Sequence, residues 1–331
     1  MISTFYATLN PMLTLFICIA IGFIVHKTKI LPENAASVMA KLETWVFCPA
    51  LSFSTMSRNC TPDTISSHAI NIMFGVVCVS LAMLISTRIS PLFVRSKGME
   101  RGIYTYALAF ANSGYVGDPL VLAMFGSKAL SYYKLFCLPI LIMIYTWGIS
   151  SLVPASAKGN PLKKLLNPST IALFCGIVFG LTGLGAHMPA PVVSSLDSLK
   201  GCMAPVAMIL AGFTIAGYDM KKMLSNKKVY VATALRLTVL PTVILTCLFG
   251  LRALLNAAFG MQISNAPLFL AFFATAAPLG LNTVVFPEAY GGDPKTGAAM
   301  TMISHTLCVV TIPLMYMLAS TVFGPAALPL G

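Results

Sequence analysis

The sequence predicts an all-α integral membrane protein with ten transmembrane helices. Of its 331 residues, 57% are hydrophobic and only 9% are charged, whereas about 25% of the residues of an ordinary soluble domain are charged. The apolar residues also form stretches of about the 20 residues that a helix needs to cross a bilayer. Two soluble domains, which the length alone would suggest, could not bury so much apolar surface.

Ten such stretches follow one another, and their short connections leave no room for a soluble domain. The first is apolar from Phe5 to Val25 with no Lys or Arg before it, so we expect a span rather than a cleaved signal peptide. The predicted spans are 5–25, 38–57, 68–87, 102–125, 133–153, 169–186, 192–217, 229–251, 266–287 and 297–320.

Lys and Arg alternate between rich and poor connections, which gives the expected orientation. Of the 21, we count fifteen with the odd-numbered connections, five with the even-numbered ones and one, Arg236, inside the eighth span. Lys41, Lys134 and Lys200 fall within the span bounds given above and are counted with the neighbouring connection. Because cytoplasmic connections are enriched in Lys and Arg, we expect both termini outside the cytoplasm, in a bacterial-type inner membrane. The five counted with the even-numbered connections are Arg58, Lys128, Lys134, Lys200 and Arg252.

The formal charge of +12 does not indicate a nucleic-acid partner, because the positive residues are scattered beside apolar segments. The nine cysteines contain no CxxC pair, so no metal site is expected. No nucleotide-binding loop is present, so we expect no cofactor and no direct use of ATP.

The two halves of the chain repeat the same helix breakers. Pro49 lies in the second span and Pro205 in the seventh; residues 112–119 interrupt the fourth span and 277–287 the ninth. Breakers in corresponding spans of two halves are the sequence mark of inverted-repeat transporters. We therefore expect a first five-helix repeat at 1–153, a cytoplasmic linker at 154–167 and a second, inverted repeat at 168–331.

The interruptions in the fourth and ninth spans are the predicted substrate site. Opened backbone at membrane depth is tolerated where protein or a cavity satisfies its polar groups, and the N-termini of the resulting half-helices attract anions. The alternative is that the prolines and glycines only kink helices for packing. The residues expected to bind substrate are Asn112, Ser113, Gly114, Gly117, Pro278, Gly280 and Asn282, and the expected breaks lie at Pro49, Pro119, Pro205, Thr283 and Pro287.

Asp118 is taken as the only carboxylate well inside an apolar span, which makes it a functional candidate. It could couple transport to protons, since a buried carboxyl group can be held neutral. Alternatively, because Asp before Pro is typical of an N-cap, it could cap the half-helix that starts at Pro119. The sequence leaves both roles open.

Three further polar residues in the spans each allow two interpretations. Arg236 could pair with a carboxylate or extend to the cytoplasmic interface. His305 could relay protons or bond the substrate, or be a packing residue. Asn282 could bond a substrate carboxylate or cap the local backbone.

Several stretches together resemble the auxin efflux carrier family, which includes the plant PIN proteins and bacterial malonate-type carriers. Asn112-Ser-Gly-Tyr-Val-Gly117-Asp-Pro119 resembles the crossover in the family's fourth helix, Asn-x-x-x-x-Gly-x-Pro. Phe47-Cys-Pro-Ala-Leu-Ser-Phe53 is similar to its second-helix proline, and the stretch from Ala277 to Tyr290 to its ninth-helix break.

The resemblance implies two inverted five-helix repeats, a homodimer, and helices 4 and 9 that cross at their breaks. It further implies a scaffold of helices 1, 2, 6 and 7 and a domain of helices 3–5 and 8–10 that moves like an elevator. The implied substrates are organic anions, chiefly carboxylates, with Asn112 in the site and Pro119 at the crossover. Two positions depart from plant relatives: Asp118 replaces an apolar residue and Thr283 a second proline.

The sequence therefore favours a permease for small organic anions, with a proton as a possible coupling ion. The first alternative is a sodium-coupled organic-anion symporter of the bile-acid type. A remote one is an intramembrane aspartyl protease with Gly117-Asp118 and Tyr218-Asp219, although its motif needs glycine where this chain has Tyr115. A membrane sensor without flux is a third.

Overall fold

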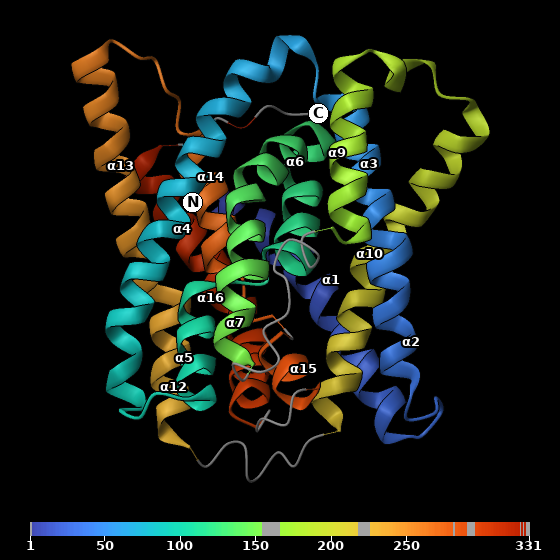
Figure 1. The fold of residues 1–331 in the computed structure, drawn as a ribbon, viewed down its shortest axis with the longest axis vertical. Coiled ribbons are helices and arrows are strands. Elements are labelled where there is room, and N and C mark those ends of the chain that lie inside the picture. Colours follow the sequence, from blue (N-terminus) through green and yellow to red (C-terminus); the bar gives the residue numbers. More distant parts are fainter. Residues whose placement is uncertain are drawn as a thin grey trace.

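A computed structural model describes residues 2–153, 166–217, 226–280, 282–289, 295–324, 326 and 328. This part of the chain is helical and contains no strand (Figure 1). The first half holds α1 (Ile2–Lys27), α2 (Ala35–Leu42), the π-helix η1 (Glu43–Phe47), α3 (Cys48–Asn59), the 3₁₀ turn η2 (Pro62–Thr64), α4 (Ile65–Phe93), α5 (Met99–Ala109), the π-helix η3 (Ser113–Gly117), α6 (Asp118–Met143), the π-helix η4 (Ile144–Gly148) and α7 (Ile149–Leu152).

The second half repeats the pattern of long helices and short interruptions. It holds α9 (Pro168–Leu181), the 3₁₀ turn η6 (Leu184–His187), α10 (Ala190–Ala216), α12 (Lys227–Ala234), the π-helix η7 (Leu235–Val239), α13 (Leu240–Phe259), α14 (Ala266–Ala276), α15 (Asn282–Ala289) and α16 (Lys295–Phe323). Most of the predicted linker, residues 154–165, lies outside the described part, as do Tyr218 and Asp219.

Six helical stretches of the described chain are long and apolar enough to cross a membrane. Two shorter apolar helices, α9 and α14, accompany them. The longest stretch, Met99–Leu152, contains both predicted spans 102–125 and 133–153. Gly126 lies between these spans with a φ of 83°, which is not helical and which favours glycine. The sequence prediction of a multi-pass, all-α membrane protein is therefore confirmed.

The helices form two packing groups. In one, α1 packs on α10, α3 packs on α9 and on α10, and α2 lies against α10. In the other, α4 packs on α5 and α6, and the helices from α12 to α16 pack on one another and on α4 to α6. Figure 1 shows α3, α9 and α10 along one side of the molecule and α4, α12 and α13 along the other. The main contact between the groups is that of α1 with α16.

Small residues let α1 and α10 approach each other closely. A Cβ atom on Gly22 of α1 would meet the carbonyl oxygen of Ile209, and one on Gly212 of α10 would meet the carbonyl oxygen of Ile19. Helices in lipid gain little from hydrophobic burial against each other, so their association relies on close backbone packing of this kind.

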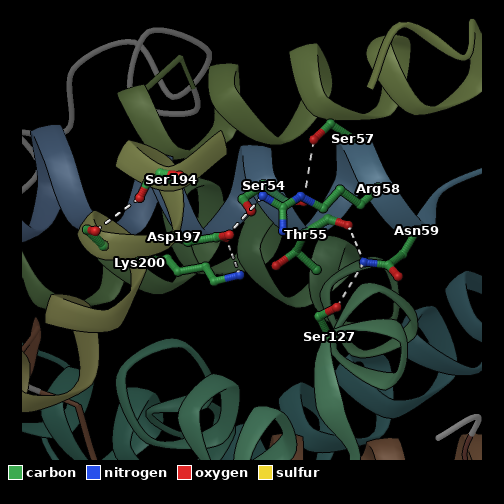
Figure 2. A network of polar contacts seen from close by, with 10 residues as sticks. Ser54, Thr55, Ser57, Arg58, Asn59, Ser127, Ser194, Asp197 and Lys200 are labelled. Atoms are coloured by element: carbon green, nitrogen blue, oxygen red, sulfur yellow. Dashed lines mark hydrogen bonds and ion pairs between the residues drawn. The ribbon is translucent and has the colours of Figure 1, made fainter. Parts of the chain in front are cut away.

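A polar network holds α3, α10 and α6 together (Figure 2). Asp197 of α10 accepts from Arg58 of α3 at 3.0 Å and from Lys200 of α10 at 2.7 Å. At the end of α3, the Asn59 side-chain amide donates to the Thr55 carbonyl oxygen at 2.9 Å and to the Ser127 hydroxyl at 3.3 Å. Because Ser127 directly follows the turn at Gly126, the network ties that turn to the end of α3.

The glycine contact between α1 and α10 gives a first prediction. Replacing Gly212 by Ala places a methyl group against the Ile19 carbonyl and should lower the free energy of unfolding by about 1–3 kcal/mol, the usual cost of overpacking. Thermal unfolding of the purified protein in detergent measures the change. Gly201→Ala in the same helix is the matched control, because open space surrounds Gly201. Equal melting temperatures for the two variants would contradict the packing described here.

Candidate functional site

The first helix break lies between α5 and η3. Phe110 is extended, and the next helical residue is Ser113. Asn112 begins the new segment as its N-cap: its side-chain oxygen accepts from the Tyr115 N–H at 3.1 Å, and its carbonyl accepts from Val116 and Gly117 at 3.2 Å. An asparagine before a helical turn is expected in this role, because its side chain replaces a missing backbone acceptor.

The second break lies between α14 and α15. Ala277 is extended, as expected for a residue before proline. The carbonyl oxygen of Ala277 accepts from Nη2 of Arg236 at 3.1 Å, and the Leu279 N–H donates to the Ser304 hydroxyl at 3.0 Å. Polar groups that α14 leaves unpaired are thus satisfied by η7 and α16.

One backbone hydrogen bond joins the two breaks. The N–H of Asn112 donates to the carbonyl oxygen of Pro278 at 2.7 Å. The breaks, which lie more than 160 residues apart in the sequence, therefore meet at one point, where each provides a polar group that the other lacks.

A cavity of about 200 Å³ lies beside this junction. Six of the predicted site residues line it: Asn112, Ser113, Gly114, Asp118, Gly280 and Asn282. Gly117 and Pro278, also predicted to bind substrate, do not line it. A Cβ atom on Gly117 would meet the hydroxyl of Tyr133, so its small size serves packing behind the cavity, and Pro278 contributes the carbonyl at the junction.

Two side-chain groups leave hydrogen-bond donors available at the cavity. The Asn112 side-chain oxygen is used in capping, and the amide nitrogen of that side chain has no partner in the described part of the chain. The Asn282 side chain donates to the hydroxyl oxygen of Tyr106 at 2.7 Å, so the Tyr106 hydroxyl proton remains free to donate. These donors lie at the wall where the two breaks meet.

Asp118 forms an ion pair with Lys134 inside the bundle. Both residues line the cavity, and their side chains are 3% and 14% exposed. The Lys134 ammonium group also donates to the Ser52 hydroxyl of α3 at 3.4 Å. Lys134 was counted with a connection between spans, and this was wrong, because it lies inside α6 with its side chain largely buried. The signal was present in the sequence, since the predicted span 133–153 contains Lys134.

The capping role considered for Asp118 is also wrong. No side chain caps α6, and the carboxylate of Asp118 is directed to Lys134 instead. The capping function belongs to Asn112, six residues earlier, because the helical conformation starts at Ser113 rather than at Pro119. Asp118 is therefore left with a charge-pairing role.

Asp118 is not the only carboxylate inside the spans, contrary to the sequence analysis. Glu43 of η1 is fully buried. The Cys48 thiol donates to one of its carboxyl oxygens at 3.5 Å, and the other oxygen has no partner in the described part of the chain. Cys48 lines the cavity, so Glu43 contacts a residue of the cavity wall without lining the cavity itself. Glu43 falls within the predicted span 38–57, so the sequence held the signal.

Arg236 and His305 lie outside the cavity wall. Arg236 is buried, so it does not extend to an interface, and its Nη2 donates to the Ala277 carbonyl oxygen. It forms no ion pair with a carboxylate in the described part of the chain. His305 of α16 has Nδ1 at 2.8 Å from the Thr301 carbonyl oxygen and lies beside Ile19 of α1, at a separate and mostly apolar cavity.

The predicted break positions differ in what they do to the helices. Pro49 follows the π-helix η1 at the start of α3, and Pro119 lies in the first turn of α6. Pro205 breaks nothing, because α10 continues through it, and Pro287 lies inside α15. A transmembrane helix tolerates an internal proline where neighbouring groups satisfy the freed carbonyl. Thr283 is buried, and its hydroxyl donates to the Gly280 carbonyl at 3.3 Å.

Helices interrupted inside an apolar bundle, with a cavity at the interruptions whose wall includes polar side chains, are typical of membrane transporters. The described part of this chain has that arrangement, and the comparisons with known proteins agree with it.

The chain belongs to the membrane transport protein family, the auxin efflux carrier family, whose pattern matches residues 7–316. An uncharacterized transporter of Methanothermobacter thermautotrophicus is 25% identical over 216 residues, which is 64% of this chain and 69% of the relative. An uncharacterized transporter of Methanocaldococcus jannaschii is 21% identical over 319 residues, 92% of this chain and 97% of the relative. The family is one of membrane transporters, not of enzymes.

The close contact of Gly117 with Tyr133 predicts that Tyr133→Phe changes the free energy of unfolding in opposite directions in the native protein and in the Gly117→Ala variant. The Tyr133 hydroxyl donates to the Ser113 carbonyl at 3.1 Å, so Tyr133→Phe alone should cost about 1 kcal/mol of unfolding free energy. Gly117→Ala should cost about 1–3 kcal/mol through the clash with that hydroxyl. In the Gly117→Ala background, Tyr133→Phe should instead be stabilising, because it removes the hydroxyl oxygen, which is the nearer of the two Tyr133 atoms that the added Cβ would meet.

Thermal melting of the two single variants and the double variant measures this cycle. Gly114→Ala is the control, since a Cβ atom there meets open space in the same turn. Simple addition of the two losses in the double variant would show that the hydroxyl does not pack against Gly117.

Proposed function

We propose that the protein is a secondary transporter of small organic anions, chiefly carboxylates, and that these bind in the cavity beside the two breaks. The observation that carries the proposal is the Asn112 to Pro278 hydrogen bond with the adjacent cavity. It brings two interrupted helices together at a pocket whose wall includes several polar side chains.

The electrostatics of the cavity favour an anion. Two helical segments begin at its wall, one at Ser113 and one at Asn282, and helix N-termini present free N–H groups and a partial positive charge. The Asn112 amide and the Tyr106 hydroxyl add uncharged donors. Carboxylate oxygens accept several such bonds at once.

The volume of the cavity favours a small substrate. Pockets for drug-sized ligands usually enclose about 300–1,000 Å³, and the cavity here is about 200 Å³. A short mono- or dicarboxylate suits such a volume better than a large amphipathic acid of the bile-acid type.

The membrane architecture that we propose is ten spans in two inverted five-helix repeats, with crossing helices 4 and 9. The order of the helices supports it: α5 to the start of α6 corresponds to the fourth span, and α14 with α15 to the ninth. The group of α1, α2, α3, α9 and α10 would be the scaffold, and the other group would move as an elevator. We further propose a homodimer in a plasma membrane with both termini outside the cytoplasm.

Asn112 tests the site directly, because its amide would donate to the substrate carboxylate. Asn112→Ala should lower the affinity for the acid roughly tenfold to hundredfold, since a hydrogen bond to a charged group contributes about 1.5–3 kcal/mol. The measurement is uptake of labelled acid into proteoliposomes as a function of concentration.

Asn226→Ala is the matched control. Asn226 caps α12 through the Lys228 N–H at 3.0 Å and does not line the cavity, so both variants lose a cap, at about 1 kcal/mol of stability. Only Asn112→Ala should change the affinity. Equal effects of the two variants would place binding elsewhere.

Thermal-shift measurements identify which acid binds, because a ligand stabilises the fold that it binds. The purified protein is tested with acetate, pyruvate, malonate, succinate and indole-3-acetate. If no acid raises the melting temperature while a neutral or cationic compound does, the anion proposal is wrong. Loss of uptake when choline replaces sodium would instead assign the protein to the sodium-coupled class.

A further inference from the structure

We propose that Lys134 is the cation that receives the substrate carboxylate, and that Asp118 releases it by accepting a proton. One proton would then bind with each carboxylate. This inference rests on the proposed function, and it adds the residue that binds the charge and the ion that is coupled to transport.

The geometry places the two groups where such an exchange can happen. Asp118 begins α6 and Lys134 lies in the same helix beyond the turn at Gly126, so the pair spans two legs of a bent segment. Both side chains line the cavity beside Asn112. An acid in the cavity therefore lies between the free amide of Asn112 and the ammonium group of Lys134.

The ammonium group has one donor to spare. It carries three N–H bonds; one is directed to Asp118 and a second to the Ser52 hydroxyl of α3. The third is available to an oxygen atom that enters the cavity. A substrate carboxylate can thus form a hydrogen bond with Lys134 while the ion pair between Lys134 and Asp118 is still intact.

The charge balance then requires a proton. The empty site is neutral, since it holds one carboxylate and one ammonium group. Adding an anion would leave a net negative charge inside the bundle, which is costly at membrane depth. Protonation of Asp118 on Oδ2 breaks its ion pair, leaves Lys134 bound to the substrate and keeps the occupied site neutral. A monocarboxylate would therefore move with its proton without moving net charge.

Among the described residues, no carboxyl group other than that of Asp118 contacts Lys134. The further titratable side chains that face it are Cys48 of α3 and Tyr133 and Cys137 of α6. Glu43 of η1 faces Cys48 and not Lys134. In the described part of the chain, Asp118 is the carboxylate that contacts Lys134.

The test counts protons on binding. The acid with the largest thermal shift among the five named above, adjusted to the protein's pH, is added to the protein in weakly buffered detergent containing a pH indicator. The native protein should take up about one proton per carboxylate bound, and its affinity should fall about tenfold for each pH unit above the range in which Asp118 titrates. Asp118→Asn should take up none and bind with an affinity independent of pH.

Transport measurements separate coupling from binding. Proteoliposomes with Asp118→Asn should still exchange labelled for unlabelled acid, because Lys134 remains available. They should not accumulate the acid against its gradient when a pH difference is imposed. The same variant with undiminished accumulation would overturn the proposal.

Further variants separate the role of each charge. Lys134→Gln should lose binding at least tenfold, and Lys134→Arg should keep it. Because Lys134→Gln leaves a buried carboxylate without a partner and can fail to fold, the double variant Asp118→Asn/Lys134→Gln is also measured. If the double variant binds as tightly as Asp118→Asn alone, Lys134 does not receive the substrate.

Glu43→Gln is the matched control for a buried carboxylate, and it should still take up one proton. Loss of proton uptake in this variant, with uptake retained in Asp118→Asn, would assign the proton to Glu43 and overturn the proposal. Binding of an acid that depends on Asn112 but takes up no proton would leave the proposed function standing and this inference refuted. Binding of no acid at all would refute both.

Discussion

A helix that stops inside an apolar bundle leaves backbone N–H and C=O groups without partners, and the structure of this protein depends on where those groups find them. Each unsatisfied group in lipid costs several kcal/mol. The hydrogen bond from Asn112 to the Pro278 carbonyl lets each of two such breaks satisfy the other. Arg236 and Ser304 provide for the neighbouring carbonyl and N–H of the second break. The cavity lies beside the point where the breaks are held together.

The same constraint explains how the charges are arranged. Arg236 is committed to a backbone carbonyl, so it stabilises the break without adding a free charge to the cavity wall. Lys134 and Asp118 neutralise each other, so the empty cavity carries no net charge. Buried ion pairs contribute little to stability because of their desolvation penalty. The place of this pair at the cavity of a membrane transporter is therefore the basis of our proposal that it serves binding.

The sequence predicted the positions of the interruptions well, because their cause is local. Asn112 caps the segment that follows the first break, and Pro278 lies in the second break. Gly117 and Pro119, also expected at the first break, lie in helical backbone beyond it. The sequence prediction failed where an effect depends on neighbours. Pro205 has the same residue type as Pro278 but leaves α10 intact. Lys134 was counted with a connection although the predicted span 133–153 contains it, and its ion pair with Asp118 crosses a turn at Gly126 that hydropathy alone does not locate.

Binding of a carboxylate between the two breaks is tested most directly by solid-state NMR of the protein in bilayers, with ¹⁵N-labelled asparagine side chains and an acid labelled with ¹³C at its carboxylate. We expect dipolar coupling between the bound carboxylate carbon and a side-chain amide nitrogen, and its loss in Asn112→Ala at a concentration that still saturates the site. A saturated site whose coupling is absent in the native protein, or unchanged in Asn112→Ala, would contradict the account.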